Sequence, residues 1–266
     1  MARKNKKTSY RFFQWLILGF GFFLLSVFLL TVFLFSRPDI FHYICHRISF
    51  FSITRKTHAV HAPDGFSIHG IDVSHYQGVI DWERVAGMKI KGTPLAFVYM
   101  RATMGADRKD KRFSAYRSEV RRTEMRFGAY HFFYHFTDPE SQARHFLDVI
   151  KPYSETDLPP VLDVEGYVSR PDSLCDRMQR WLDIVQKETK KRPIIYTNYK
   201  LYRQYFRKRF RNYTFWIAHY NISFTPALQD PSVLFWQHQE EGKIPGIEED
   251  VDLNVFSGSD EQFLEL

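Results

Sequence analysis

Short apolar runs rich in β-branched and aromatic residues recur through the last 200 or so residues, and this rhythm constrains the fold more than any other feature. The runs lie at 68–74, 95–103, 126–136, 160–165, 193–198, 215–220, 233–239 and 250–256. Helical patterns separate several of them. Strands that alternate with helices indicate a parallel sheet, and eight strands in a domain of about this size predict an α/β fold, a TIM-like β/α barrel.

The connections between the runs change in character along the chain. The helix predicted at 173–190 has its apolar stripe at Leu174, Met178, Trp181 and Val185. Asp172 or Ser173 is its predicted cap. Later connections, such as 211–214 and 221–232, are short or lack a helical pattern. We therefore expect an irregular barrel.

A long uncharged segment precedes the domain, at residues 12–35. It is long enough to cross a bilayer core of about 30 Å as a helix. A cleaved signal peptide has an apolar core of only about 7 to 15 residues followed by small residues, whereas "LFSRPD" follows here. The segment therefore favours an uncleaved transmembrane helix.

The charges beside this segment predict its orientation. Five basic residues precede it, at Arg3, Lys4, Lys6, Lys7 and Arg11. The positive-inside rule places residues 1–11 in the cytoplasm as a basic tail. Residues 36–65 then form a juxtamembrane connector, and 66–266 form an extracytoplasmic catalytic domain, periplasmic or extracellular, on a single-pass membrane protein.

The basic character of the chain is confined to its beginning. Residues 1–65 hold nine Lys or Arg against two Asp or Glu, which gives +7, and residues 66–266 hold 28 of each sign, which gives zero. Because a nucleic-acid-binding domain needs a basic face, we predict no nucleic-acid partner. The basic run at 202–212 is interpreted as a solvated helix face or turn, with contact to anionic lipid or wall polymer left open.

Three D-x-E triplets occur, and two of them begin helical patterns. Asp81 and Asp138 are placed as helix caps, each with a glutamate in the first turn. The third triplet, Asp163 and Glu165 in "LPPVLDVEG", follows a buried type of strand. Alternate residues of a strand share a face about 6.6 Å apart, so both carboxyls enter one space. In a β/α barrel the carboxyl ends of the strands line the active site, which favours a chemical role for this pair.

Further acids are expected at the same edge. Asp72 lies on the first strand, and Asp252 and Asn254 lie on the last. The first and last strands are neighbours in a closed barrel, so these groups can converge. Two nearby carboxyls of unequal environment are what glycosidic cleavage requires, and crowding raises the pKa of at least one, which becomes the general acid.

Aromatic and histidine side chains near strand ends are candidate ligand contacts. The aromatic residues are Tyr76, Tyr130, Tyr134, Tyr196, Trp216 and Trp236. Taken singly, each is more typical of a core residue than of a ligand contact; Tyr196 and Trp216 are the preferred exceptions, as sugar contacts. His131 and His135 have the spacing of a zinc helix, but the glutamate of H-E-x-x-H is missing and the segment is typical of a strand. We predict no metal site and no cofactor.

Several stretches together resemble glycoside hydrolase family 25, the lysozymes (N-acetylmuramidases) of the Chalaropsis type. They are "GIDVSHYQG", "FVYMRATMG", "GAYHFF", "LPPVLDVEG", "IIYTN", "FWIAHY" and "WQHQEEGKIPGIEEDVDLNVF", and they span residues 69–256. One departure is visible, because the family commonly has Glu at the position of Met104.

The resemblance implies an irregular β/α barrel that cleaves the β-1,4 bond between N-acetylmuramic acid and N-acetylglucosamine in peptidoglycan. Glu165 would be the general acid and Asp163 its partner, with Asp72 and Asp252 completing the acidic site. Residues assigned to substrate binding are Tyr76, Gln77, Tyr130, Tyr196 and Trp216. Two alternatives stay open: a wall-binding protein that has lost activity, and a D-x-E glycosidase acting on another N-acetylated glycan such as chitin.

Overall fold

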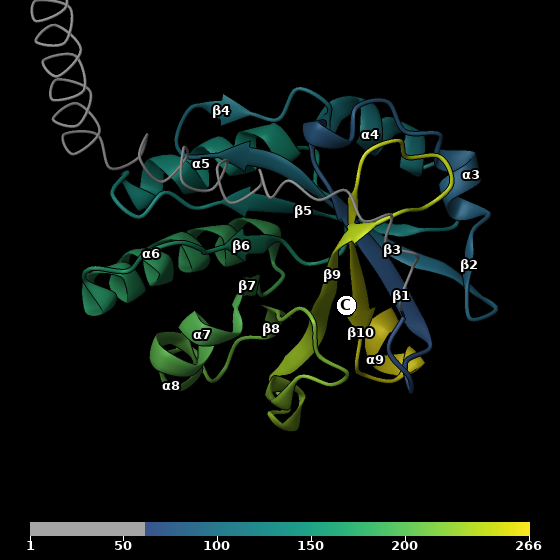
Figure 1. The fold of residues 1–266 in the computed structure, drawn as a ribbon. Helices are drawn as coiled ribbons and strands as arrows, with labels where there is room; N and C mark the ends of the chain where they lie inside the picture. The colour runs from purple at the N-terminus through teal and green to yellow at the C-terminus, as the bar shows by residue number, and fades with distance from the viewer. Residues whose placement is uncertain (1–61) are drawn as a thin grey trace, which may run out of the picture. The chain divides into compact units, whose positions relative to one another are not determined.

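The computed structural model describes residues 62–266 (Figure 1). The predicted basic tail and membrane helix, and all but the last residues of the connector, lie outside this range. Within 62–266 no helix has the length and apolar character needed to span a bilayer.

Eight strands close into a barrel within the described residues (Figure 1). In order around the ring they are β1 (Ile68–Val73), β3 (Thr93–Met104), β5 (Arg126–Phe132), β6 (Val161–Asp163), β7 (Ile194–Asn198), β8 (Phe215–Ala218), β9 (Val233–Gly242) and β10 (Val251–Phe256). Two short strands, β2 (Lys89–Ile90) and β4 (Arg108–Lys109), pair with β3 outside the ring. Each of the eight predicted runs therefore supplies one barrel strand.

Within the barrel ring, the strands are parallel except at β10. The seven strands from β1 to β9 in the ring pair in parallel, whereas β10 is antiparallel to both β9 and β1. The connection at 243–250 is too short for a parallel crossover, which needs about a dozen residues or more. The expectation of a parallel sheet is thus wrong for this strand. As a result, the beginning of β10 lies beside the carboxyl end of β1, with Asp252 opposite Asp72.

Aromatic rings fill the barrel interior toward the amino ends of the parallel strands. We call this set the aromatic layer: Phe97, Tyr99, Trp216, Phe235 and Phe256. Ring centroids lie 5.5 Å apart for Phe97 and Phe235, and 5.0 Å apart for Phe235 and Phe256. Glycine makes room for them, because a Cβ on Gly70 would lie 2.4 Å from the Phe97 ring. The interior is therefore a packed core.

Inward-facing residues become polar toward the carboxyl ends of the parallel strands. Side chains alternate across a strand with period two, so β3 presents Arg101 after Tyr99, and β9 presents Gln237 after Phe235. We call the resulting set the polar layer: Asp72, Arg101, Asp163, Gln237, Asp252 and Asn254.

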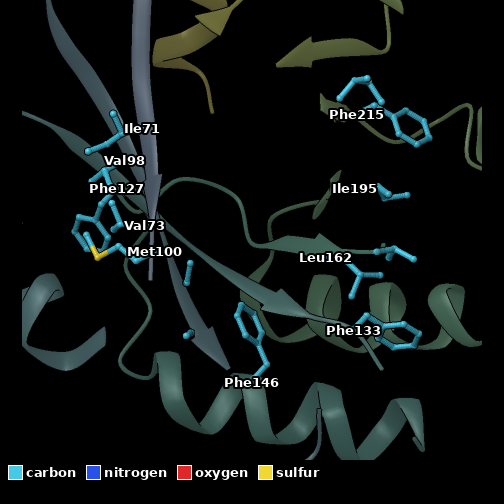
Figure 2. Packing of buried hydrophobic residues seen from close by; sticks show 14 of the residues in the cluster. Ile71, Val73, Val98, Met100, Phe127, Phe133, Phe146, Leu162, Ile195 and Phe215 are labelled. Atoms are coloured by element: carbon cyan, nitrogen blue, oxygen red, sulfur yellow. The ribbon is translucent and has the colours of Figure 1, made fainter. Parts of the chain in front are cut away.

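Outward-facing strand residues pack under the helices. Figure 2 shows Ile71, Val98, Leu162 and Ile195 among the buried side chains of this outer core. The covering helices are α3 (Trp82–Ala86), α4 (Phe113–Val120), α5 (Pro139–Ile150) and α6 (Pro171–Thr189). The predicted stripe of α6 is buried, at Leu174, Met178, Trp181 and Val185.

Two of the predicted helix caps are confirmed and one is wrong. The carboxylates of Asp81 and Asp138 accept hydrogen bonds from the backbone N–H groups of Arg84 (3.2 Å) and Ser141 (2.8 Å). For α6 the cap was expected at Asp172 or Ser173, but the helix already begins at Pro171, with Arg170 at the N-cap position. Proline is favoured at the first helical position because its fixed φ suits it and it has no N–H to satisfy.

The second half of the barrel is irregular, as expected. Between β7 and β8 the chain forms α7 (Tyr199–Leu201), a π-helical turn (Tyr202–Phe206) and α8 (Arg207–Arg209). After β8 a single 3-10 turn occurs at Pro226–Gln229, and the chain ends with α9 (Asp260–Leu264). Within the basic run, Arg207 pairs with Asp230 at 2.8 Å and Arg209 with Asp176 at 2.6 Å.

Candidate active site

The strand β6 carries the acid pair to the carboxyl edge of the barrel and then turns away. Asp163 is its last residue and is buried, while Glu165, two residues on, is half-buried. The backbone N–H of Val164 still donates to the carbonyl of Tyr196 at 2.9 Å. Gly166 then adopts a φ of 89°, in the left-handed region that favours glycine. The chain therefore leaves the sheet directly after presenting both carboxyls.

Asp163 and Glu165 are close enough to interact electrostatically. Burial raises the pKa of Asp163 well above its ordinary value, and the neighbouring carboxylates of Glu165 and Asp72 raise it further, while Arg101 opposes the shift. Glu165 is the more exposed member of the pair, so its carboxyl is the one that a bound molecule can reach.

One oxygen of Asp163 has no partner in the described part of the chain. Its Oδ1 is buried and makes no hydrogen bond to any residue of 62–266. A buried acceptor without a donor costs about 1 to 3 kcal/mol. An arrangement of this kind is suited to receive an N–H or O–H from a ligand.

Asp72 is held by two side-chain amides. Its Oδ2 accepts from Gln237 Nε2 at 2.7 Å and from Asn254 Nδ2 at 2.8 Å. Burial raises the pKa of Asp72 from 3.8 to about 6, although hydrogen bonds from Asn254, Gln237 and Asp252 act in the opposite direction. Asp72 is thus a carboxylate whose charge depends on these donors.

Neighbouring aromatic residues fix the orientation of the two amides. The indole Nε1 of Trp216 donates to Asn254 Oδ1 at 2.8 Å, and the hydroxyl of Tyr196 donates to Gln237 Oε1 at 2.6 Å. The hydroxyl of Tyr220 donates to the same oxygen. Because an indole N–H can only donate, the amide oxygen of Asn254 must face it and the NH₂ group must face Asp72.

Asp252 lies opposite Asp72 in the register of β1 and β10. Loss of solvent raises the pKa of Asp252 well above its ordinary value, and repulsion from Asp72, Glu240 and Glu165 raises it further. The hydrogen bond between the two carboxyls favours the protonated form of Asp252 and the ionised form of Asp72. The site therefore contains two carboxyl pairs, Asp163 with Glu165 and Asp72 with Asp252.

A cluster around the buried Arg101, which was not expected from the sequence, lies beside the acids. Arg101 Nε donates to Asp110 Oδ2 at 3.1 Å, and the backbone N–H of His75 donates to the same oxygen at 3.0 Å. Although burial raises the pKa of Asp110, the Arg101 charge and these N–H donors outweigh it and lower that pKa. Arg101 could have been suspected because it follows Tyr99 at the inward period of β3.

The predicted substrate contacts separate into exposed and buried residues. Tyr76 is 40% exposed, and the Arg101 guanidinium lies 5.2 Å from its ring centre. Tyr130 is half-buried, and both tyrosines remain available to a ligand. Trp216 is only 2% exposed and Tyr196 only 8%. Direct stacking of a sugar on Trp216 does not fit this burial, and its observed role is to orient Asn254.

Gln77 serves the backbone around the site. Its Oε1 accepts from the N–H of Ser74 at 2.8 Å, and its Nε2 donates to the carbonyl of Asp250 at 2.8 Å. With both amide groups engaged, Gln77 ties the end of β1 to the segment before β10. Met104, at the position of the family's usual Glu, is the half-buried last residue of β3.

His131 is a core residue. It hydrogen-bonds Thr103 Oγ1 at 2.7 Å and Gln142 Oε1 at 3.2 Å, and its ring stacks on Trp181 with centroids 5.5 Å apart. Burial lowers its pKa to about 3. Among residues 62–266 no group of three or more His, Cys, Asp or Glu side chains has an arrangement that could hold a metal ion.

Comparisons with known proteins agree with this geometry. A family model described as "Glycosyl hydrolases family 25" matches residues 71–247. "Uncharacterized protein YegX" of Escherichia coli K12 is 39% identical over 209 residues, covering 78% of this chain and 76% of that protein. "Lysozyme M1" of Streptomyces globisporus is 31% identical over 220 residues, covering 76% and 72%.

Solved structures give the same result. A family 25 glycosyl hydrolase from Bacillus anthracis superposes with a TM-score of 0.71 at 30% identity, covering 79% of this chain and 98% of that chain. A bacterial lysozyme from Streptomyces coelicolor gives a TM-score of 0.63 at 29% identity, covering 76% and 97%.

Proposed function

The chain belongs to glycosyl hydrolase family 25, and from that premise we propose that it hydrolyses peptidoglycan at the β-1,4 bond between N-acetylmuramic acid and N-acetylglucosamine. It would thus be a lysozyme of the Chalaropsis type. The observation that carries the proposal is the position of Asp163 and Glu165 at the carboxyl end of β6, at the same edge of the barrel as Asp72 and Asp252. The lysozyme names of several relatives support the choice of substrate.

Glu165 acts as the general acid in the proposed reaction. It donates its proton to the glycosidic oxygen as the bond from that oxygen to the anomeric carbon breaks. The negative charge on the Asp72 and Asp252 pair stabilises the positive charge that develops on the sugar. Water later attacks the anomeric carbon, and the Glu165 carboxylate takes up its proton, which restores the starting state.

Asp163 assists through the sugar and does not form a bond to it. The 2-acetamido N–H donates to the buried Oδ1 of Asp163, which lacks a partner within residues 62–266. The acetamido oxygen, held in place, attacks the anomeric carbon and forms a cyclic oxazolinium intermediate. Two displacements on the same carbon leave the configuration retained, with no covalent sugar–enzyme adduct.

A gel assay distinguishes the proposed function from the two alternatives. Zymography with purified peptidoglycan in one gel and chitin in another should show clearing on peptidoglycan alone. Clearing on chitin would favour a glycosidase of different specificity, and clearing on neither would favour a wall-binding protein. Mass analysis of the released fragments should find N-acetylmuramic acid at the new reducing ends, which identifies the bond.

We also propose that residues 12–35 anchor the protein in the membrane, with residues 1–11 in the cytoplasm and the catalytic domain outside it. The long uncharged run and its basic flank support this. A reporter fused after Leu266 should be active only outside the cytoplasm, and the protein should stay with membranes after a carbonate wash. A mature protein that begins near Ser36 would instead show cleavage.

A further inference from the structure

A cavity of about 200 Å³ lies between the connections that follow β5 and β6. Its lining residues are His135, Phe136, Val168, Ser169, Arg170, Ser173, Leu174 and Arg177. We call it the arginine pocket. At about 30 Å³ per water molecule, it can hold a small organic group as well as solvent.

The charged side chains that line the arginine pocket are cationic. Arg170 and Arg177 contribute guanidinium groups, and none of the described residues that line the pocket is an Asp or Glu. The acids nearby in sequence lie outside the lining: Asp138 caps α5 through Ser141, and Asp176 pairs with Arg209. Asp172 lies in the first turn of α6. A pocket with two guanidinium groups and no carboxylate favours an anion.

The donors in the pocket are incompletely used. Arg177 Nη2 donates to the carbonyl of Thr137, but its Nε is buried and has no hydrogen-bond partner among residues 62–266. Arg170 stands at the N-cap of α6, where its side chain makes no capping hydrogen bond. The positive end of a 19-residue helix thus opens beside the two guanidinium groups. A planar carboxylate matches the paired N–H geometry of arginine.

The pocket lies within reach of the reaction centre. Val168, in its wall, follows Glu165 by three residues, so their Cα atoms are at most about 11 Å apart. In peptidoglycan, O3 of each N-acetylmuramic acid carries a lactyl group that begins a peptide stem, and the stem carries carboxylates. A stem several residues long, on a sugar held at Glu165, can span a distance of this size.

We propose that the arginine pocket binds a carboxylate of the peptide stem, so that the enzyme acts on peptide-substituted glycan. This inference rests on the proposed function. Phe136, which is 54% exposed, and Val168 provide an apolar wall for the stem's alkyl groups. Arg170 and Arg177 determine the preference for substituted strands and take no part in the proton transfers at Glu165.

The test compares two forms of one substrate. Intact peptidoglycan and the same strands stripped of peptides by an amidase are digested by the wild type, Arg170→Gln and a matched control, Arg180→Gln. The amidase leaves the lactyl carboxylate on each sugar, so the comparison isolates the carboxylates of the stem itself. Arg180 is exposed on α6 and does not line the pocket. We expect the wild type to favour intact strands, and Arg170→Gln to lose about tenfold in kcat/KM on these alone. Arg180→Gln should match the wild type, and Arg177→Lys should weaken the preference.

The outcomes separate this inference from the proposed function. Equal hydrolysis of both substrates by the wild type, or an equal loss on both in Arg170→Gln, would overturn the stem site while leaving the hydrolase intact. Hydrolysis of neither would overturn the proposed function. In that case, binding affinities test the stem site. We expect the protein to bind muramyl dipeptide more tightly than free N-acetylmuramic acid, and we expect Arg170→Gln to abolish this difference. Equal binding of the two compounds by the wild type would contradict the stem site.

Discussion

Along β3 the inward side chains change from Phe97 and Tyr99 to Arg101, and along β9 they change from Phe235 to Gln237. The aromatic layer and the polar layer are thus built by the same strands a few residues apart. Rings in contact at 5.0 to 5.5 Å fill the first. In the second, burial raises the pKa values of Asp72, Asp163 and Asp252.

The difference indicates that the aromatic layer stabilises the fold and that the polar layer carries the chemistry. Burial of aromatic surface stabilises the fold without any polar group left unmatched. The polar layer gathers like charges and leaves Asp163 Oδ1 without a partner in the described chain, which opposes folding. We therefore expect substitutions in the aromatic layer to change stability, and substitutions in the polar layer to change activity.

The largest effect is expected from Glu165→Gln. Glutamine keeps the shape but cannot give up a proton, so the rate of peptidoglycan hydrolysis should fall about 10² to 10⁴-fold. The thermal midpoint should stay close to that of the wild type. Glu119→Gln, an exposed change on α4, is the control and should retain full activity. More than a tenth of the wild-type rate in Glu165→Gln would contradict the assignment of the general acid.

The reverse pattern is expected from Gly70→Ala in the aromatic layer. The added Cβ would lie 2.4 Å from the Phe97 ring, which is held by Phe235 and Phe263. Overpacking of this kind costs about 1 to 3 kcal/mol in the free energy of unfolding, measured by chemical denaturation. The rate per folded molecule should be unchanged, and Phe97→Leu in the same chain should restore part of the stability. A loss of activity in Gly70→Ala without a loss of stability would contradict the expectation that the aromatic layer affects stability alone.

Trp216→Phe tests the boundary between the two layers. Phenylalanine keeps most of the packing but removes the N–H that orients the Asn254 amide toward Asp72. We expect kcat to fall about tenfold, in line with the loss of one buried hydrogen bond, with KM little changed. A rise in KM at constant kcat would instead indicate that Trp216 contacts the sugar.

The smallest expected change in stability is a gain in Asp163→Asn. The folded-state pKa of Asp163 is raised above its ordinary 3.8, so the folded protein binds a proton that the unfolded chain has released. This contribution to stability is complete below pH 3.8 and is lost as the pH rises through the folded-state pKa. Asparagine cannot ionise, so it avoids this loss of stability at high pH. The variant should therefore be more stable at pH 7 by about 1 kcal/mol, or about 2 to 4 °C in thermal midpoint.

The comparison for this variant is made across pH. The advantage of Asp163→Asn should shrink toward zero as the pH is lowered to about 4, because both proteins are then neutral at this position. An equal advantage at both pH values would show that the raised pKa is not its cause.

The strands were predictable because each combines an apolar outer face with a change of inward residues at its end. Asp72 and Asp163 were predictable for the same reason, since each lies at the end of an apolar run, whereas Asp252 lies at the start of the last run, next to an acidic stretch. The parallel pairing expected of β10 failed because the pattern of a strand does not contain its direction. Side-chain hydrogen-bond partners could not be predicted either. No sequence pattern indicates that Trp216 contacts Asn254 or that Arg101 contacts Asp110, because these residues come together only when the barrel closes.

The stereochemistry of the reaction tests the central claim most directly, namely that the acid pair on β6 cleaves the bond with the help of the substrate's own acetamido group. Proton NMR of the first product released from peptidoglycan, recorded before mutarotation, distinguishes the two anomers. The arrangement of Asp163 and Glu165 predicts the retained β anomer. An initial α anomer would contradict it and would point to Asp72 or Asp252 activating a water molecule from the opposite face of the sugar.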